Sequence, residues 1–175
     1  MLSEVVPTCS LVTDMSSMFK GCTILNGPIN IGNWSTQNVT NMGSTFEGAS
    51  AFDKNIGSWN TQSVTDMSNL FNGATAFDQS LGSWTLNAAV SLTSIFENSG
   101  LSCYSYSETL KGWSANSATP GGLNLQAGGK SYSASSESAR TNLINKGWTI
   151  GGDAPSGGEC PPPLSGTQFV TRWNL

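Results

Sequence analysis

The chain has 175 residues, a formal net charge of −4 and only 10% charged residues. It contains no histidine, which excludes His-based acid–base, nucleophilic and metal-binding chemistry. The acidic balance also excludes the basic footprint of a nucleic-acid-binding protein. The 37% of apolar residues, with 6 Trp and 7 Phe among them, still predict a buried core.

Residues 1–11 are interpreted as an entry segment that caps the N-terminal end. They lack the basic and apolar regions of a signal peptide, so either a signal has been removed or the chain is part of a longer protein. The sequence contains no run of 18 apolar residues, and we therefore expect no membrane span in this segment.

A repeat occupies residues 12–96 in four copies. Its first block has Val-Thr-Asp/Asn-Met followed by Phe, and its second block has Ile/Leu-Gly-x-Trp. The fourth copy departs from this consensus and keeps only apolar residues at the Met and Phe positions. The anchor positions are Met15, Met42, Met67 and Leu92, then Phe19, Phe46, Phe71 and Phe96, and finally Trp34, Trp59 and Trp84.

The spacing of about 25 residues fits one coil of a leucine-rich-repeat-like solenoid. It predicts an α/β solenoid, a right-handed coil with five or six short parallel strands in one sheet. We expect the Ile-Gly-x-Trp block to form the strand and the Met-to-Phe block to form short helices or 3-10 turns. Each coil would bury its Phe and Trp between neighbouring coils.

Equal positions of stacked repeats form polar columns, such as Asn26, Asp53 and Asp78. Short polar side chains at fixed corners usually hydrogen-bond the turn backbone, and this is the favoured interpretation. Calcium between Asp53 and Asp78 is the alternative, although calcium prefers six to eight oxygen ligands. The Trp column is interpreted as core, with a sugar-stacking platform as the alternative.

Residues 97–153 are predicted to form larger, α-bearing coils that cap the C-terminal end. Apolar residues at helical spacing predict one helix around Tyr106 and Trp113 and another around Ala139 and Leu143. Short strands are expected at Gly100-Leu101, Gly122-Leu123-Asn124-Leu125 and Gly147-Trp148-Thr149-Ile150. Residues 154–168 form a Pro/Gly linker, and residues 169–175 alternate like the first strand of a following β module.

Four cysteines in a short, weakly charged chain favour an oxidising, extracytoplasmic setting. We predict the disulfides Cys9–Cys22 and Cys103–Cys160, since the linker that carries Cys160 is long enough to fold back on the cap. Free thiols in a cytosolic protein remain the alternative.

The repeat block at residues 64–84 resembles the repeats of BspA-like leucine-rich-repeat bacterial surface proteins. The cap is similar to that family as well, in Leu110-Lys111-Gly112-Trp113 and in Gly147-Trp148-Thr149-Ile150. The resemblance covers about residues 12–153 and implies secretion, surface attachment and adhesion, without a reaction. The fourth repeat copy departs from the repeat pattern of that family.

We therefore expect a non-enzymatic, extracellular or cell-surface module that needs no cofactor and binds a protein or glycan partner. Further domains of the parent chain would be its other contacts. The alternative is a purely structural spacer, and an enzyme is disfavoured because the few acidic residues sit mostly at repeat corners. Candidate ligand contacts are Tyr104, Tyr132 and Trp173.

Overall fold

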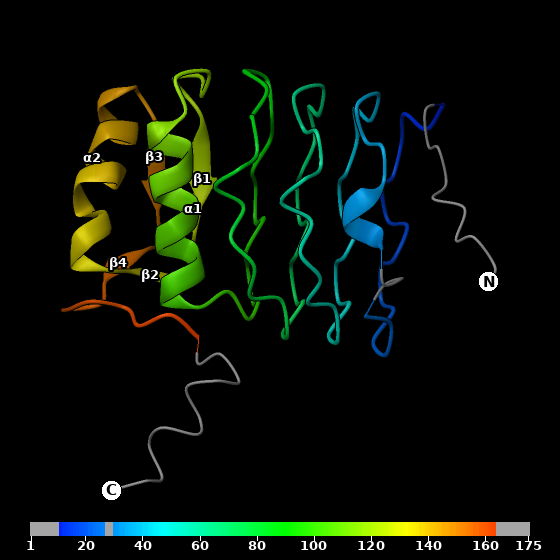
Figure 1. The fold of residues 1–175 in the computed structure, drawn as a ribbon, viewed down its shortest axis with the longest axis horizontal. Coiled ribbons are helices and arrows are strands. Elements are labelled where there is room, and N and C mark those ends of the chain that lie inside the picture. The colour runs from blue at the N-terminus through cyan, green and yellow to red at the C-terminus, as the bar shows by residue number, and fades with distance from the viewer. Residues whose placement is uncertain (1–10, 27–29, 164–175) are drawn as a thin grey trace, which may run out of the picture.

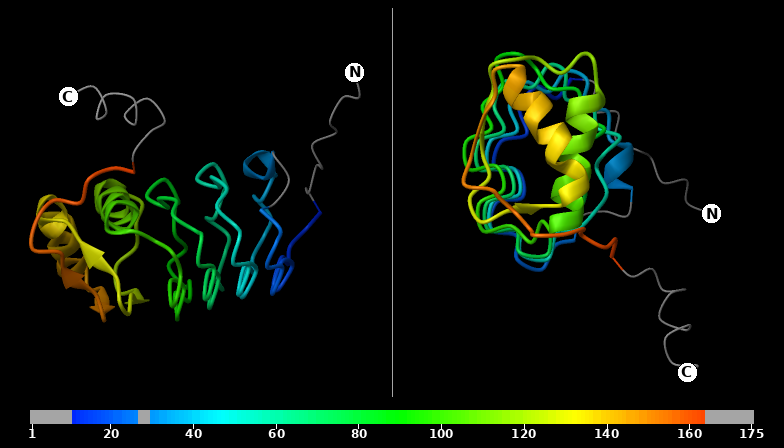
Figure 2. Two further views of the ribbon diagram at one scale, coloured as in Figure 1. Left: turned by 90° about the horizontal axis from the view of Figure 1, so that it is seen from below. Right: turned by 90° about the vertical axis from the view of Figure 1, so that its left-hand side faces the viewer.

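The repeats lie side by side along the long axis of the molecule, as successive layers of turn-rich chain (Figure 1). The computed structural model describes residues 11–26 and 30–163. We use "layer" for the residues of one repeat. The left panel of Figure 2 shows the layers edge-on, and the right panel shows their outlines superposed along the stack.

Main-chain hydrogen bonds join each layer to the next in a regular pattern. Met15 donates its N–H to the carbonyl of Asn41 (2.9 Å), and Met42 donates in the same way to Asp66 (2.8 Å). Every second residue along the Met-to-Phe block repeats this bond. The donors are Met15, Ser17, Phe19 and Gly21, then Met42, Ser44, Phe46 and Gly48, then Met67, Asn69, Phe71 and Gly73.

The predicted α/β solenoid of leucine-rich-repeat type is wrong. The described residues contain two sheets of two parallel strands each, and all four strands lie between residues 124 and 155. Within the repeats, the described residues contain turns, one 3-10 helix and isolated bridges, which link Asp14 to Asn41, Asn41 to Asp66, and Asp66 to Ser91.

Local backbone conformation explains why the described residues of the repeats form no strand. The Ile-Gly-x-Trp block closes a turn, because the N–H of Trp59 donates to the carbonyl of Ile56 (3.0 Å). In the first layer the same block forms the 3-10 helix η1, Ile31–Asn33. The Met-to-Phe block contains a left-handed residue in each layer, such as Asn69 with φ of +55°. A strand needs consecutive extended residues, and these positions interrupt it.

The core follows the repeat, as the sequence predicts. Phe46, Phe71, Trp59 and Trp84 are all buried, which confirms the core interpretation of these slots. The rings of Phe46 and Phe71 stack at a centroid distance of 5.7 Å. Trp34, in the first layer of the Trp column, is only partly buried.

The polar columns hydrogen-bond the backbone, which confirms the favoured interpretation. The N–H of Asp53 donates to Asn26 Oδ1 (2.8 Å), and the N–H of Asp78 donates to Asp53 Oδ1 (2.9 Å). The column ends at Ser102, whose N–H donates to Asp78 Oδ1 (2.8 Å). Among the described residues, no group of three or more His, Cys, Asp or Glu lies together in a way that could hold a metal ion.

Both predicted helices are confirmed in the C-terminal part. They are α1 (Cys103–Ala115) and α2 (Glu137–Asn145), and the short 3-10 helix η2 (Ala134–Ser136) precedes α2. Strand β1 (Asn124–Gln126) pairs with β3 (Thr149–Gly151), and β2 (Ser131–Tyr132) pairs with β4 (Ala154–Pro155). The strand predicted at Gly100-Leu101 is absent from the structure. A parallel bridge from Leu92 to Leu125 joins this part to the fourth layer.

Candidate functional site

A polar groove runs from η1 to α1 across the Gly-x-Trp turns of the layers. It has a volume of about 820 Å³ and is open to solvent along one side. Its floor carries small side chains, the amides Asn30, Asn33 and Asn55 and the hydroxyls Ser58, Ser80 and Ser83. The repeat therefore places similar polar groups at similar points of successive layers.

Some polar side chains of the groove hydrogen-bond the backbone of the turns and so stabilise them. Asn55 Oδ1 accepts the N–H of Gly57 (2.8 Å), and the hydroxyl of Ser83 donates to the carbonyl of Gly57 (2.7 Å). Ser58 makes the equivalent bond to Gly32. Ser80 Oγ accepts the N–H of Gly82 (3.2 Å). The amide NH₂ of Asn55 and acceptor lone pairs of the Ser58 and Ser83 hydroxyls remain available to a ligand.

Helix α1 forms the end wall of the groove and presents Tyr104, Glu108 and Lys111 to it. The side chain of Ser102 caps the helix by accepting the N–H of Ser105 (3.2 Å). The helix approaches the last Gly-x-Trp turn closely, since a Cβ on Gly82 would lie 2.6 Å from the carbonyl oxygen of Glu108. A Cβ on Gly112 would overlap the backbone of Gly82.

Gly112→Ala is expected to push α1 away from the turn at Gly82. The extra methyl group meets backbone atoms that cannot rotate away, so we expect a loss of about 1–3 kcal/mol in the free energy of unfolding. Gly128→Ala is the matched control, because nothing lies within 4 Å of its Cβ position. Urea denaturation of the two variants measures the difference, and equal midpoints would contradict the close contact.

The groove is close to electrically neutral. Its two charged side chains, Glu108 and Lys111, form an ion pair with an N–O distance of 3.0 Å, and both are more than a third exposed. The other lining side chains are neutral amides, hydroxyls and a phenol. Such a lining suits a neutral ligand with many hydroxyl or amide groups.

The predicted ligand-contact residues Tyr104 and Tyr132 do not lie together in one site. Tyr104 is partly exposed and lines the groove. Tyr132 is 5% exposed and packs in the interior, with the guanidinium carbon of Arg140 5.2 Å from the centre of its ring. Trp173 lies outside the described residues. The structure therefore does not bring Tyr104 and Tyr132 together on one surface.

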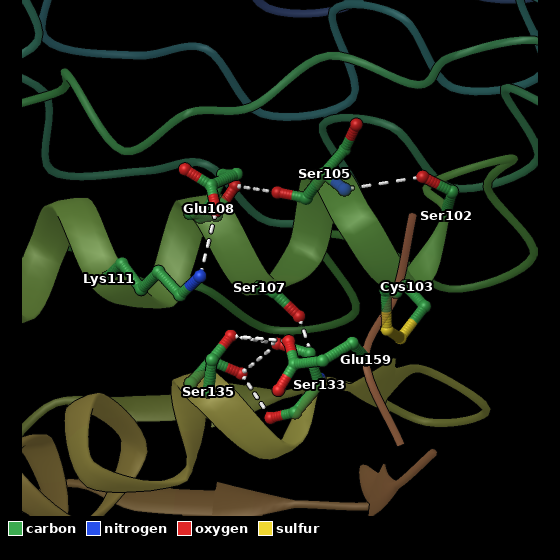
Figure 3. A network of polar contacts seen from close by, with 12 residues as sticks. Ser102, Cys103, Ser105, Ser107, Glu108, Lys111, Ser133, Ser135 and Glu159 are labelled. Atoms are coloured by element: carbon green, nitrogen blue, oxygen red, sulfur yellow. Dashed lines mark hydrogen bonds and ion pairs between the residues drawn. A yellow bond between two sulfur atoms is a disulfide. The ribbon is translucent and has the colours of Figure 1, made fainter. Parts of the chain in front are cut away.

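The disulfide Cys103–Cys160 is confirmed. It joins the first residue of α1 to the segment after β4, and the two Cα atoms are 5.7 Å apart. Figure 3 shows the polar contacts beside it. Ser133 donates its N–H to Ser107 Oγ (2.8 Å), and the hydroxyl of Ser135 donates to Glu159 Oε2 (2.7 Å). The disulfide holds Cys160 to α1, and the Ser135–Glu159 bond holds Glu159 to η2. The Ser133–Ser107 bond joins the residue before η2 to α1.

Removing this disulfide by the double change Cys103→Ala and Cys160→Ala is expected to cost about 2–4 kcal/mol of stability. The bridge spans 57 residues of the chain and so restricts the unfolded state strongly. Thermal unfolding checks this, and a non-reducing digest of the wild-type protein should release the linked peptide. A double variant as stable as the oxidised wild type would contradict the expectation.

The second predicted disulfide, Cys9–Cys22, stays a prediction. Cys9 lies outside the described residues, and Cys22 is partly exposed. None of the helices in residues 11–26 and 30–163 is long and apolar enough to cross a membrane.

One polar cluster was missed in the sequence. Arg140 on α2 makes two hydrogen bonds to Asp153, from Nε (2.8 Å) and from one terminal nitrogen (2.7 Å). The hydroxyl of Tyr106 on α1 donates to the same carboxylate (2.9 Å). The available signal was the rarity of charge, since an Arg and an Asp flanking a strand stand out in a chain with 10% charged residues. We name Tyr106, Arg140 and Asp153 the cap clamp.

Comparison with known protein families finds a match. The sequence profile of the family DUF285, described as "Mycoplasma protein of unknown function", matches residues 6–116. This range covers the repeats, the whole of α1 and most of the chain. No curated protein and no solved structure matches the chain. The chain therefore belongs to the DUF285 family.

Proposed function

We propose that this chain is a non-enzymatic module of a secreted or cell-surface protein, and that it binds a protein or glycan partner in the groove between η1 and α1. The single observation that carries the proposal is the groove itself, with its volume of about 820 Å³ and its neutral polar lining. Its dimensions fall within the range of ligand-binding clefts in proteins.

The chemistry of the groove favours a partner that offers both hydroxyl groups and apolar C–H faces. The amides of Asn33 and Asn55 supply neutral donors and acceptors, and the ring of Tyr104 supplies a flat apolar face. A glycan chain has both properties. A protein loop rich in polar side chains offers the same groups with less regular spacing.

The extracellular location is supported by the disulfide between Cys103 and Cys160, because such bonds persist in oxidising compartments. The resemblance of residues 12–153 to BspA-like surface proteins implies the same setting and an adhesive role. Further domains of a longer parent chain would then present the groove to its partner.

Tyr104→Ala is expected to weaken binding about tenfold, which corresponds to about 1.4 kcal/mol. The probe is an array of neutral oligosaccharides together with a panel of extracellular matrix proteins, followed by calorimetric titration of each ligand that binds. Tyr104→Phe should keep most of the affinity, because the ring remains. Thr93→Ala, an exposed position that does not line the groove, is the unaffected control.

A structural spacer is the second candidate function. It is favoured because polar side chains that recur in the repeat hydrogen-bond the neighbouring layer. The hydroxyl of Thr65, for example, donates to the carbonyl of Thr40 (3.2 Å). A spacer predicts no ligand on either panel and no effect of Tyr104→Ala. That result would replace the binding proposal.

A further inference from the structure

A second cavity lies between the fourth layer and the C-terminal part of the chain. Its volume is about 470 Å³, and it is lined by Ser94, Glu97 and Asn98 on one side and by Gln126 with three glycines on the other. None of these residues lines the groove between η1 and α1. The cavity adjoins the Met-to-Phe block, whereas the groove crosses the Gly-x-Trp turns, so an inference about the cavity does not rest on the function proposed for the groove.

The fourth layer brings main-chain N–H donors to this cavity. In the third layer, Asn69 donates its N–H to the carbonyl of Thr93 (2.9 Å), and Gly73 makes an equivalent bond to the fourth layer (2.9 Å). Ser94 and Asn98 occupy the same two slots one repeat later, and they share the left-handed backbone, with φ of +51° and +53°. Within residues 11–26 and 30–163, neither of these two N–H groups has a main-chain acceptor.

The chain of the C-terminal part leaves the stack just where these donors begin. A parallel bridge still joins Leu92 to Leu125. Two residues later, the N–H of Ala127 donates to the carbonyl of Gly151 on β3 (2.8 Å), and the carbonyl of Ala127 accepts the N–H of Lys130 in a turn (3.0 Å). The main chain after β1 therefore pairs with β3 and with itself, and it does not continue along the fourth layer.

Glycines form much of the opposite wall of the cavity. They are Gly128, Gly129 and Gly151, and a Cβ built on any of the three would have nothing within 4 Å. Glycine in or beside a strand often marks a place where another backbone approaches closely. The side chain of Gln126 adds an amide to this wall, and its Oε1 accepts a long hydrogen bond from the hydroxyl of Ser94 (3.5 Å).

One carboxylate gives the cavity its charge. Glu97 is exposed, and it is the charged member of the lining. Lys130 follows Gly129 in the sequence, but its ammonium group donates to the carbonyl of Ser99 (2.7 Å), and it does not line the cavity. The cavity therefore offers main-chain donors and one negative charge. A ligand that complements it has carbonyl acceptors and a positive charge.

We propose that this cavity binds a short basic peptide segment, which takes the place that a further layer would occupy. Its main-chain carbonyls accept the N–H groups of Ser94 and Asn98, and a Lys or Arg side chain pairs with Glu97. Main-chain hydrogen bonds to an unpaired edge are a common source of affinity in peptide recognition. The volume lies within the range of ligand-binding clefts. A neutral glycan offers neither the repeated carbonyls nor the positive charge.

The test uses the full chain labelled with ¹⁵N. The probes are N-acetylated, C-amidated short peptides of Gly, Ser and Asn that carry one Lys, with a matched panel that carries Glu instead. We expect a Lys peptide to slow hydrogen exchange at the amides of Ser94 and Asn98 about tenfold, because bonded amides are protected. The amides of Asn69 and Gly73, which already bond the fourth layer, should not change.

Two variants locate the binding. Gly151→Leu places a side chain in the cavity without left-handed strain, and we expect it to weaken binding at least about tenfold. Glu97→Gln should weaken binding of Lys peptides about threefold, as expected for an exposed ion pair, and should remove their advantage over Glu peptides. Glu47→Gln changes the same slot two layers earlier and is the unaffected control.

The exchange measurement is made on the wild-type chain, so it decides the question even where Gly151→Leu fails to fold. The proposal is overturned if no Lys peptide protects Ser94 and Asn98, if Glu peptides protect them equally well, or if neutral oligosaccharides do so. Unchanged peptide binding in Tyr104→Ala supports a site separate from the groove. Loss of peptide binding in that variant would assign the peptide to the groove and overturn the proposal.

Discussion

Phe71→Ala is expected to lower the free energy of unfolding by about 3–5 kcal/mol, a large share of the stability of a domain of this size. Phe71 is fully buried, and its ring lies 3.8 Å from that of Phe77 and 5.7 Å from that of Phe46, measured between centroids. Truncation leaves a cavity between two layers, which the hydrogen-bonded backbone on each side prevents from collapsing. Chemical denaturation measures the loss.

The matched control for Phe71 is Asn69→Gly in the same block. Asn69 has φ of +55°, a conformation that glycine adopts without strain, so we expect a change well below that of Phe71→Ala. A β-branched residue at this position would be strained and is not a suitable control. Equal losses for Phe71→Ala and Asn69→Gly would show that the ring column is not the main source of stability.

Asp153→Ala is expected to destabilise the protein by about 3–5 kcal/mol through the cap clamp. The side chain of Asp153 is fully buried, and that of Arg140 is 17% exposed. Removing the carboxylate leaves the guanidinium without its ion-pair partner and the Tyr106 hydroxyl without its acceptor. Burial, together with the nearby Asp153 carboxylate, raises the pKa of Tyr106, so its hydroxyl stays a hydrogen-bond donor at neutral pH.

Glu108→Ala is the comparison variant, because it removes a solvent-exposed ion pair. Glu108 and Lys111 are separated by one helical turn on the surface of α1, and such exposed pairs contribute about 0–1 kcal/mol. Thermal denaturation of both variants should therefore give a large shift for Asp153→Ala and a small one for Glu108→Ala. Similar shifts would mean that the clamp contributes no more than a surface pair.

Residue spacing in the sequence was sufficient to predict which side chains are buried and where the helices and one disulfide lie. Burial of Phe46, Phe71, Trp59 and Trp84, the two helices and the disulfide between Cys103 and Cys160 follow from spacing, and the structure confirms them. These features depend on which residues face inward and on how far a linker can reach. Both can be worked out from residue types and their separation.

The local backbone conformation could not be predicted in the same way. The positions Ser17, Ser44, Asn69 and Ser94 adopt φ between +51° and +58°, and serine rarely does so. Nothing in a Ser-rich segment marks these positions, so turns were predicted as helices and as strands. The groove was also missed, because it arises only when turns distant in the sequence meet α1. The cap clamp joins Tyr106 to Asp153 across 47 residues and depends on the same kind of long-range contact.

The hydrogen bonds between layers also give the stack a chemical polarity. Along the Met-to-Phe block every interlayer N–H points toward the C-terminus, so the first layer presents carbonyl groups at its outer edge. Among the described residues, no main-chain donor bonds the carbonyls of Asp14, Ser16, Met18 and Lys20. Two such edges brought face to face would oppose carbonyl to carbonyl and repel. Two copies of the chain therefore cannot pair through the Met-to-Phe edges of their first layers. This disfavours the edge-to-edge aggregation that is common at an open β-strand with unpaired N–H and C=O groups.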